Sequence, residues 1–324
     1  MKPIQRILLA TDFSDGASAA IPAARQLAEN HQGRVDIIHV IPMLRYLNES
    51  LKKLSAPVDL SRDVFPEILK QSEVACQTIL NDSFPKELRG EVIVKIDRKP
   101  SEVISEIASD EGYDLIVMGT RGEHTNRAIR GTITEKVIRH SRVPVLSVDE
   151  PWQQETIGSI LLPTDTSELS FTALPMAANL AFQYGAKITI YHVLELYGRF
   201  PDLSADPGTG EKTALYELII ERLTEWLETE GLDHLHVERS GVIFEDELRW
   251  IQEDGSISIP LSCVIEKGIS AHQEIERYAR NHADLVVLAT HGRSGLAHIF
   301  LGSTAEKVAQ YVGKPVLTVR PALE

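Results

Sequence analysis

An internal repeat is the feature that most constrains how this chain folds. The two halves match at three places in the same order, which begin at Ile7 and Ile160, Asp114 and Asp284, and Gly131 and Gly302. The last pair reads Gly-Thr-Ile-Thr-Glu-Lys-Val in the N-terminal half and Gly-Ser-Thr-Ala-Glu-Lys-Val in the C-terminal half. A period of about half the chain is far longer than the roughly 20–50 residues of a solenoid repeat. The chain therefore consists of two diverged copies of one domain.

Length and composition fit two globular domains in tandem. The 324 residues provide two domains of ordinary size, and a hydrophobic content of 43% lets each bury its own core. The polar, proline-containing segment 149–155 is the natural boundary, so we predict domains over 1–150 and 151–324. Because this linker is short, we expect the halves to pack together rather than to be loosely tethered.

Charge and residue usage argue against several classes of function. The formal net charge of −14 argues against broad nucleic-acid binding, which needs a basic face. No apolar run approaches the ~20 residues of a membrane span, and the first residues lack the apolar core of a secretory signal. The only cysteines, Cys76 and Cys263, fit a reducing compartment. We expect a cytoplasmic protein with neither nucleic-acid nor membrane partners.

Short apolar runs alternate with longer amphipathic stretches in both halves. In the N-terminal half we predict strands over 4–10, 35–41, 91–96, 115–119 and 145–148, and helices over 14–30, 63–82, 101–110 and 132–140. In the C-terminal half we predict strands over 159–162, 187–193, 261–265, 285–289 and 315–319, and helices over 168–184, 213–230, 271–281 and 303–311. Strands that are apolar on both faces and separated by helices indicate an α/β fold with a covered parallel sheet.

Three segments depart from this regular alternation. Residues 43–60 and 196–210 each follow a second strand and are expected to be loops or lids. Residues 238–258 have no counterpart in the N-terminal half and form an insertion. The dipeptide Asp254-Gly255 is a turn signal, which favours an added β-hairpin; a loop with one short helix is the alternative.

A glycine-rich turn follows the fourth strand of the C-terminal half. Small or basic residues and hydroxyls recur here, at Ala289, Thr290, Gly292, Arg293, Gly295, Gly302, Ser303 and Thr304. Small residues let backbone N–H groups approach an anion closely, and the N-terminus of the next helix adds its dipole and free donors. The turn therefore predicts a phosphate-binding site. The alternative is a tight strand–helix turn in which Ser303 caps the helix.

The spacing Ala289-x2-Gly292-x9-Gly302-Ser303 resembles a motif of the universal stress protein family. Nucleotide-binding members of that family carry G-x2-G-x9-G-(S/T), so alanine here replaces the first glycine. The resemblance covers nearly the whole chain and matches the tandem members. It implies two Rossmann-like (adenine nucleotide α-hydrolase-like) domains, each a five-stranded parallel sheet of order 3-2-1-4-5 flanked by helices, with the ligand at the carboxyl ends of strands one and four. It also implies an internal pseudo-dimer through the fifth strands, with further homodimerisation left open.

The same resemblance assigns further nucleotide-binding residues near the first two strands of the C-terminal half. They are Pro163, Thr164, Asp165, Thr166 and Val193. Asp165 would contact the adenine–ribose side of the ligand, and Val193 would contact adenine through its backbone. The alternatives are that Asp165 or the serine after it caps the next helix, and that Val193 is a core valine.

The corresponding site of the N-terminal half is degenerate. It keeps Thr11, Asp12, Val40, Gly119, Gly122, Gly131 and Thr132. However, residues 123–130 make the loop one residue shorter than 293–301, and Glu123 stands where the other half has Arg293. A carboxylate beside a phosphate is repulsive, so we expect nucleotide binding in the C-terminal half.

The resemblance to the universal stress protein family implies a stress-response protein that binds ATP, with or without Mg²⁺, and acts on an unknown protein partner. One alternative is a slow ATPase or a protein that phosphorylates itself at Ser303 or Thr304; another is a nucleotide-free scaffold. We predict no catalytic residue, because no Walker A sequence or obvious general base accompanies the turn. His39 and His192 occupy matching positions and are expected to be structural. We expect no metal site, since two histidines at 234 and 236 lack a third ligand nearby in sequence.

Overall fold

The computed structural model describes residues 3–43, 65–120, 132–150, 152, 157–195, 209–252, 255–291 and 302–321. The chain forms two compact units, one from Lys2 to Gln153 and the other from Gln154 to Glu324. The predicted loops over 43–60 and 196–210 lie almost wholly outside the described residues. The pairing of the halves through their fifth strands stays a prediction.

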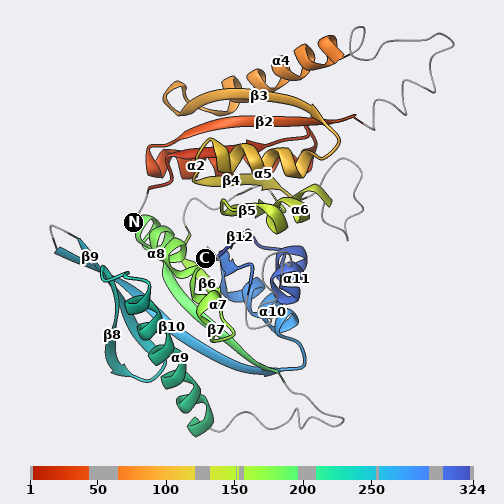
Figure 1. Ribbon diagram of the computed structural model, residues 1–324. Helices are drawn as coiled ribbons and strands as arrows, with labels where there is room; N and C mark the ends of the chain where they lie inside the picture. Colours follow the sequence, from red (N-terminus) through yellow and green to blue (C-terminus); the bar gives the residue numbers. More distant parts are fainter. Residues whose placement is uncertain are drawn as a thin grey trace. The chain divides into compact units, whose positions relative to one another are not determined.

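The N-terminal unit is a five-stranded parallel sheet covered by helices on both faces (Figure 1). Its elements are β1 (Arg6–Ala10), α1 (Asp15–Ser18), α2 (Ile21–His31), β2 (Arg34–Pro42), α4 (Phe65–Ser83), η2 (Lys86–Leu88), β3 (Arg89–Asp97), α5 (Pro100–Asp110), β4 (Leu115–Gly119), α6 (Thr132–His140) and β5 (Val145–Val148). The strand order is β3-β2-β1-β4-β5, the predicted 3-2-1-4-5. Helices α2 and α4 pack on one face, and α5 and α6 pack together on the other.

The C-terminal unit repeats this arrangement and adds two strands. Its elements are β6 (Ser159–Pro163), α7 (Glu168–Phe171), α8 (Leu174–Tyr184), β7 (Lys187–Glu195), α9 (Thr209–Thr229), β8 (Leu235–Val242), β9 (Glu245–Gln252), β10 (Gly255–Gly268), α10 (Ala271–His282), β11 (Leu285–Ala289), α11 (Ser303–Tyr311) and β12 (Val316–Val319). The strand order is β12-β11-β6-β7-β10-β9-β8. Five parallel strands therefore follow the predicted order, but the prediction of a five-stranded sheet is wrong for this unit.

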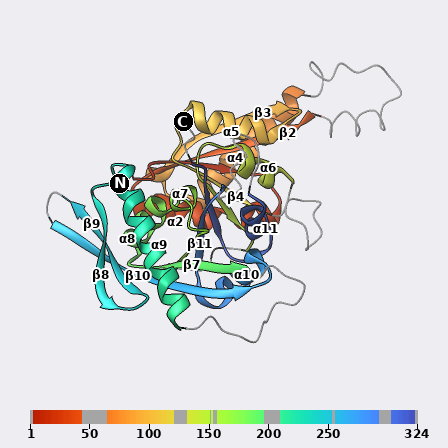
Figure 2. The ribbon, with the colours of Figure 1, turned by 60° about the horizontal axis from the view of Figure 1, so that its bottom comes forward.

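The insertion contains the predicted antiparallel pairing of neighbouring strands, and it extends the sheet of this unit. Strand β10 is 14 residues long, and its first part pairs with β9 while its second part pairs with β7. Strand β9 pairs in turn with β8, so the alternative of a loop with a short helix is excluded. Alternate residues such as Leu248, Trp250 and Ile259 are buried, and α8 and α9 pack on these strands (Figure 2). This period of two is the sequence signal of a half-buried strand.

Two predicted helices are each broken in two. Helix 14–30 is α1 followed by α2, and helix 168–184 is α7 followed by α8. A proline stands in the first turn of the second member of each pair, at Pro22 and Pro175. Proline has no backbone N–H to continue a preceding helix, whereas its fixed φ suits the start of a new one. The prediction of continuous helices is therefore wrong at matching places in both repeats.

A buried carboxylate ties the inserted strands to helix α9. Asp246 on β9 has a side chain only 2% exposed, and its Oδ2 accepts a hydrogen bond of 2.5 Å from the Tyr216 hydroxyl of α9. Its Oδ1 accepts from the backbone N–H of Ser240 at 3.2 Å and lies 3.3 Å from Arg239 Nε. Burial and the hydrogen bond to Asp246 raise the pKa of Tyr216. The insertion is thus anchored by one charged group on β9 whose partners lie on β8 and on α9.

The two cysteines are buried and form no disulfide. Burial raises the pKa of Cys76 and of Cys263 to about 12, which keeps both thiols protonated and unreactive at neutral pH. No helix in the described part of the chain combines the length and the apolar composition needed to cross a bilayer.

Candidate functional site

A cavity of about 500 Å³ lies at the carboxyl ends of β6, β7 and β11 in the C-terminal unit. The starts of α10 and α11 complete its wall. Most of the residues predicted for the nucleotide site line it, namely Pro163, Thr164, Asp165, Val193, Ala289, Thr290, Gly302, Ser303 and Thr304. Gly292, Arg293 and Gly295 lie outside the described residues. The structure therefore brings together three segments far apart in sequence at the switch point of a doubly wound sheet.

The turn after β6 holds Asp165 in place and caps α7. Asp165 Oδ1 accepts from the backbone N–H of Ser167 at 3.0 Å and from its hydroxyl at 2.5 Å. Ser167 in turn caps α7 by accepting from the backbone N–H of Ser170 at 3.3 Å. Asp165 lines the cavity at the same time, so capping and a place at the cavity are compatible.

Thr166 is the predicted residue that the structure places elsewhere. Its backbone takes the left-handed conformation with φ of 68°, as does Phe13 at the matching position of the other repeat. Arg222 of α9 donates to both the carbonyl oxygen and the hydroxyl of Thr166, at 3.1 and 3.2 Å. Thr166 thus contacts α9 and does not line the cavity.

Val193 lies beyond the end of the neighbouring strand. The register of β6 and β7 ends with the pair Pro163 and Tyr191, and the N–H of Thr164 then bonds the carbonyl of Tyr191 at 2.9 Å. Alternate peptide groups of a strand point to the same side, so those of Val193 point to the β6 side past the last pair of the ladder. This backbone position can hydrogen-bond the edge of a planar base.

The start of α11 forms the opposite wall of the cavity. Its N-cap is Gly302, whose N–H donates to the carbonyl of Thr290 at 2.8 Å and thereby fixes the helix to the end of β11. A Cβ on Gly302 would lie 3.3 Å from that carbonyl oxygen, which explains why a glycine fits this close approach. Among the described residues, no side chain caps the N-terminus of this nine-residue helix. The first-turn N–H groups and the Ser303 and Thr304 hydroxyls can therefore receive an anion.

Matching histidines hold the first two strands of each unit together. His192 Nδ1 lies 2.9 Å from the carbonyl oxygen of Thr164, and His39 Nδ1 lies 2.7 Å from that of Thr11. Both imidazoles are buried. These contacts agree with the structural role predicted for the two histidines.

Sequence reasoning missed several residues of the cavity wall. Residues that line it but were not predicted include His291, Glu195, Tyr191 and Ser170. His291 was detectable, because it lies between Thr290 and Gly292 in the glycine-rich turn. The others follow from the fold alone, since they lie on neighbouring strands or on α7.

The matching strand end of the N-terminal unit is built differently. A Cβ on Gly119 would lie 2.0 Å from the carbonyl oxygen of Gly16, because α1 rests directly on the end of β4. Its counterpart Ala289 carries a side chain that lines the cavity. Thr11, Asp12 and Val40 occupy the predicted strand ends. Gly122, Gly131 and the side chain of Thr132 lie outside the described residues.

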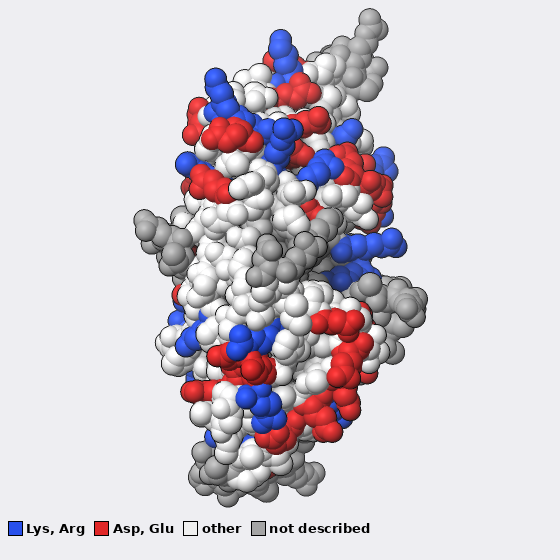
Figure 3. Space-filling model, turned by 90° about the vertical axis from the view of Figure 1, so that its left-hand side faces the viewer, with Lys and Arg blue, Asp and Glu red and all other residues white. Residues whose placement is uncertain are grey.

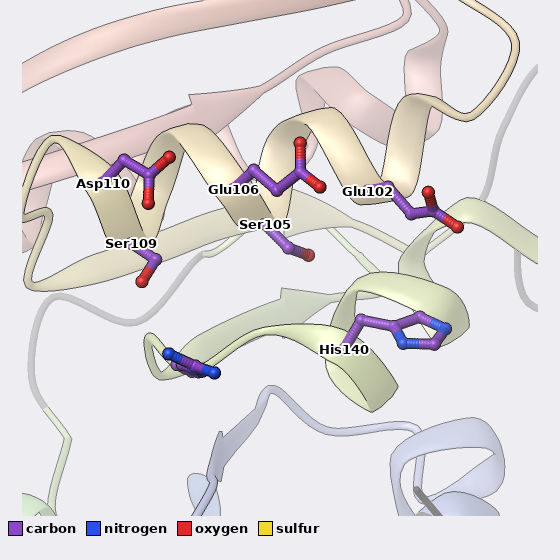
Figure 4. A pocket seen from close by; sticks show the side chains of 7 residues that line it. Glu102, Ser105, Glu106, Ser109, Asp110 and His140 are labelled. Carbon is purple, nitrogen blue, oxygen red and sulfur yellow. The ribbon is translucent and has the colours of Figure 1, made fainter.

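A pocket of about 370 Å³ in the N-terminal unit lies elsewhere, between α5 and α6 (Figure 4). Carboxylates from Glu102, Glu106 and Asp110 project from successive turns of α5, and His140 lies opposite them on α6. Arg142 also lines it. Three carboxylates disfavour a phosphorylated ligand, so this pocket is no counterpart of the C-terminal cavity.

Comparison with known proteins gives consistent matches over both halves. The model of the universal stress protein family matches residues 3–149 and 156–320. A universal stress protein of Mycolicibacterium smegmatis is 23% identical over 97% of each chain. One from Methanocaldococcus jannaschii is 30% identical over 161 residues, which cover 50% of this chain and 81% of that protein. The crystal structure of a universal stress protein from Archaeoglobus fulgidus covers 98% of both chains at 21% identity, with a TM-score of 0.58, and shows the same fold.

Proposed function

Because this chain belongs to the universal stress protein family, we propose that its C-terminal unit binds ATP and that the protein acts as a nucleotide-dependent stress-response module. The N-terminal unit then serves as the degenerate partner of the pair. The observation that carries the proposal is the cavity at the ends of β6, β7 and β11, which gathers the predicted residues around a space of about 500 Å³. Such a volume is in the range of small-molecule sites.

Each part of an adenine nucleotide has a matching wall in this cavity. The start of α11 offers N–H groups and hydroxyls to the phosphates. Asp165 offers a carboxylate oxygen to the ribose hydroxyls, and the backbone of Val193 offers its polar groups to the base edge. Apolar side chains such as Ile275 and Leu288 complete the wall for a planar ring.

The surface charge supports a small anionic ligand rather than a polyanion. On the face drawn in Figure 3, Lys and Arg side chains stand among Asp and Glu side chains. A broad nucleic-acid interface needs a basic surface, whereas the formal net charge here is −14. The helix start that lines the cavity can attract phosphate locally in spite of that net charge.

The proposal is tested by comparing Asp165→Ala with Asp12→Ala. Both aspartates accept the same hydrogen bonds from the serine two residues later, so both variants lose the same turn contacts. Asp165→Ala is expected to weaken Mg-ATP binding by about 10-fold, the value of one hydrogen bond to a charged group. Asp12→Ala is expected to leave it unchanged. Equilibrium dialysis with labelled ATP measures both, and equal affinity in all three proteins would contradict the assignment.

A further inference from the structure

His291 carries a buried polar atom without a partner at the wall of the proposed nucleotide site. The residue is 9% exposed and lines the cavity. Its Nε2 is buried and, within the part of the chain that the structure describes, has no hydrogen-bond partner. An unpaired polar group in the interior costs about 1–3 kcal/mol, so it calls for an explanation.

The opposite edge of the ring is held firmly. His291 Nδ1 lies 2.9 Å from the hydroxyl oxygen of Thr290, whose own side chain is buried. The carbonyl of Thr290 accepts the N–H of Gly302, so the imidazole is attached to the same peptide that fixes the start of α11. Its position relative to the phosphate-binding wall is therefore set by the backbone.

The contact with Thr290 allows three proton arrangements, and two of them make Nε2 a donor. When the hydroxyl donates to Nδ1, the neutral ring must carry its proton on Nε2, which is then a donor. When the ring is protonated, Nδ1 donates to the hydroxyl oxygen instead and Nε2 is again a donor. In these two states the unpaired atom can donate a hydrogen bond to an anionic oxygen. A neutral ring that carries its proton on Nδ1 instead leaves Nε2 an acceptor, and uptake of a proton turns that tautomer into a donor as well.

A buried, unpaired histidine is not by itself a ligand contact. His31 at the end of α2 also has ring nitrogens with no partner among the described residues, and burial lowers its pKa, but it does not line this cavity. His291 differs because it lines a cavity beside the start of α11 and has one edge fixed. Those two features distinguish a histidine that can contact a ligand from a neutral histidine of the core.

We propose that His291 is a ligand-contacting residue whose Nε2 donates to a phosphate oxygen of the bound nucleotide and that binding there takes up a proton. This inference rests on the proposed nucleotide site. It goes beyond that proposal by making affinity depend on pH.

The charges around His291 set the direction of this dependence. Burial lowers the pKa of His291, and the positive charge of Arg320, just beyond β12, lowers it further. The other titratable groups that line the cavity in the described part of the chain are Asp165 after β6 and three residues of β7, namely Tyr191, His192 and Glu195. The free imidazole is therefore neutral at pH 7, and a phosphate brought against it would raise its pKa. Binding then favours the protonated ring, so affinity rises as the pH falls.

The test compares wild-type protein with His291→Gln, which keeps a polar side chain but does not titrate. Arg121→Gln changes the matching position of the other repeat and serves as the control. The ratio of the variant's Kd to the wild-type Kd for Mg-ATP is expected to be about 5-fold at pH 8 and to grow to 10-fold or more at pH 6. Because ATP itself titrates equally in both measurements, the ratio isolates the protein group. Arg121→Gln is expected to follow the wild type.

A measurement on unmodified protein guards against misfolding of the variant. The histidine proton resonances of the wild type, with that of His291 identified from the variant's spectrum, are followed against pH with and without Mg-ATP. The pKa of His291 is expected to rise on binding. If the wild type binds no nucleotide, the proposed function fails; if it binds and both the Kd ratio and the His291 pKa are unaffected, only the role of His291 is overturned.

Discussion

Replacing Ser303 with aspartate is expected to weaken Mg-ATP binding by about 100-fold or more without loss of the fold. Ser303 is the first residue of α11, is exposed, and lines the cavity. A new carboxylate there would stand against the phosphates, and two unit charges about 4 Å apart repel by roughly 4 kcal/mol at an effective dielectric constant near 20. The same carboxylate favours the helix, because a negative charge near the N-terminus complements the helix dipole.

The repeat offers a matched control for this substitution. Thr132→Asp places the same charge at the first residue of α6 in the N-terminal unit. Calorimetric titration with Mg-ATP is expected to show normal affinity in Thr132→Asp and no measurable heat in Ser303→Asp, with both proteins giving wild-type far-UV spectra. If Thr132→Asp alone lost binding, the nucleotide would bind in the N-terminal unit, which would contradict the proposed site in the C-terminal unit.

Replacing Asp246 with alanine is expected to lower the free energy of unfolding of the C-terminal unit by about 3 kcal/mol. The substitution leaves the Tyr216 hydroxyl, the Ser240 N–H and one side of Arg239 without their shared acceptor. Removing one member of a buried ionic cluster costs about 3–5 kcal/mol, and the lower end applies because the Arg239 side chain is 47% exposed and screened by solvent.

Hydrogen exchange resolved by peptide is the measurement for Asp246→Ala. Faster exchange is expected in β8, β9 and α9, while peptides of the N-terminal unit keep their protection. Asp36→Ala is the matched control: Asp36 accepts from the Tyr113 hydroxyl at 2.6 Å and from the Glu91 N–H at 2.6 Å, and its loss should affect β2 and β3 instead. Unchanged exchange in β8 and β9 of Asp246→Ala would show that this carboxylate does not anchor the insertion.

Much of the fold could be predicted because both repeats carry the same pattern of apolar runs and amphipathic stretches. Each apolar run bounded by turn residues is a strand in the structure, and the parallel order follows from the alternation with helices. The breaks before α2 and α8 were missed because the apolar stripe continues through them, although Pro22 and Pro175 mark the starts of new helices. The added strands were underestimated because β10 continues a core strand without any break in sequence.

The positions of site residues could be predicted where the ends of strands and helices determine them. They could be predicted less well where a side chain can contact one of several neighbours. Gly302 and Asp165 lie at ends of elements, so their positions follow from the fold. Thr166 stands beside them in sequence, yet it is held by Arg222 of α9, and no local sequence pattern predicts that contact. The unpaired Nε2 of His291 likewise depends on what surrounds the ring, which sequence does not specify.

The central claim is that one unit of this tandem protein binds ATP and the other does not. Calorimetric titration of nucleotide-free wild-type protein with Mg-ATP tests it most directly. One site per chain is the predicted result. Two sites per chain would show that the N-terminal turn also binds despite its shortened loop, and no binding by correctly folded protein would contradict the nucleotide site altogether.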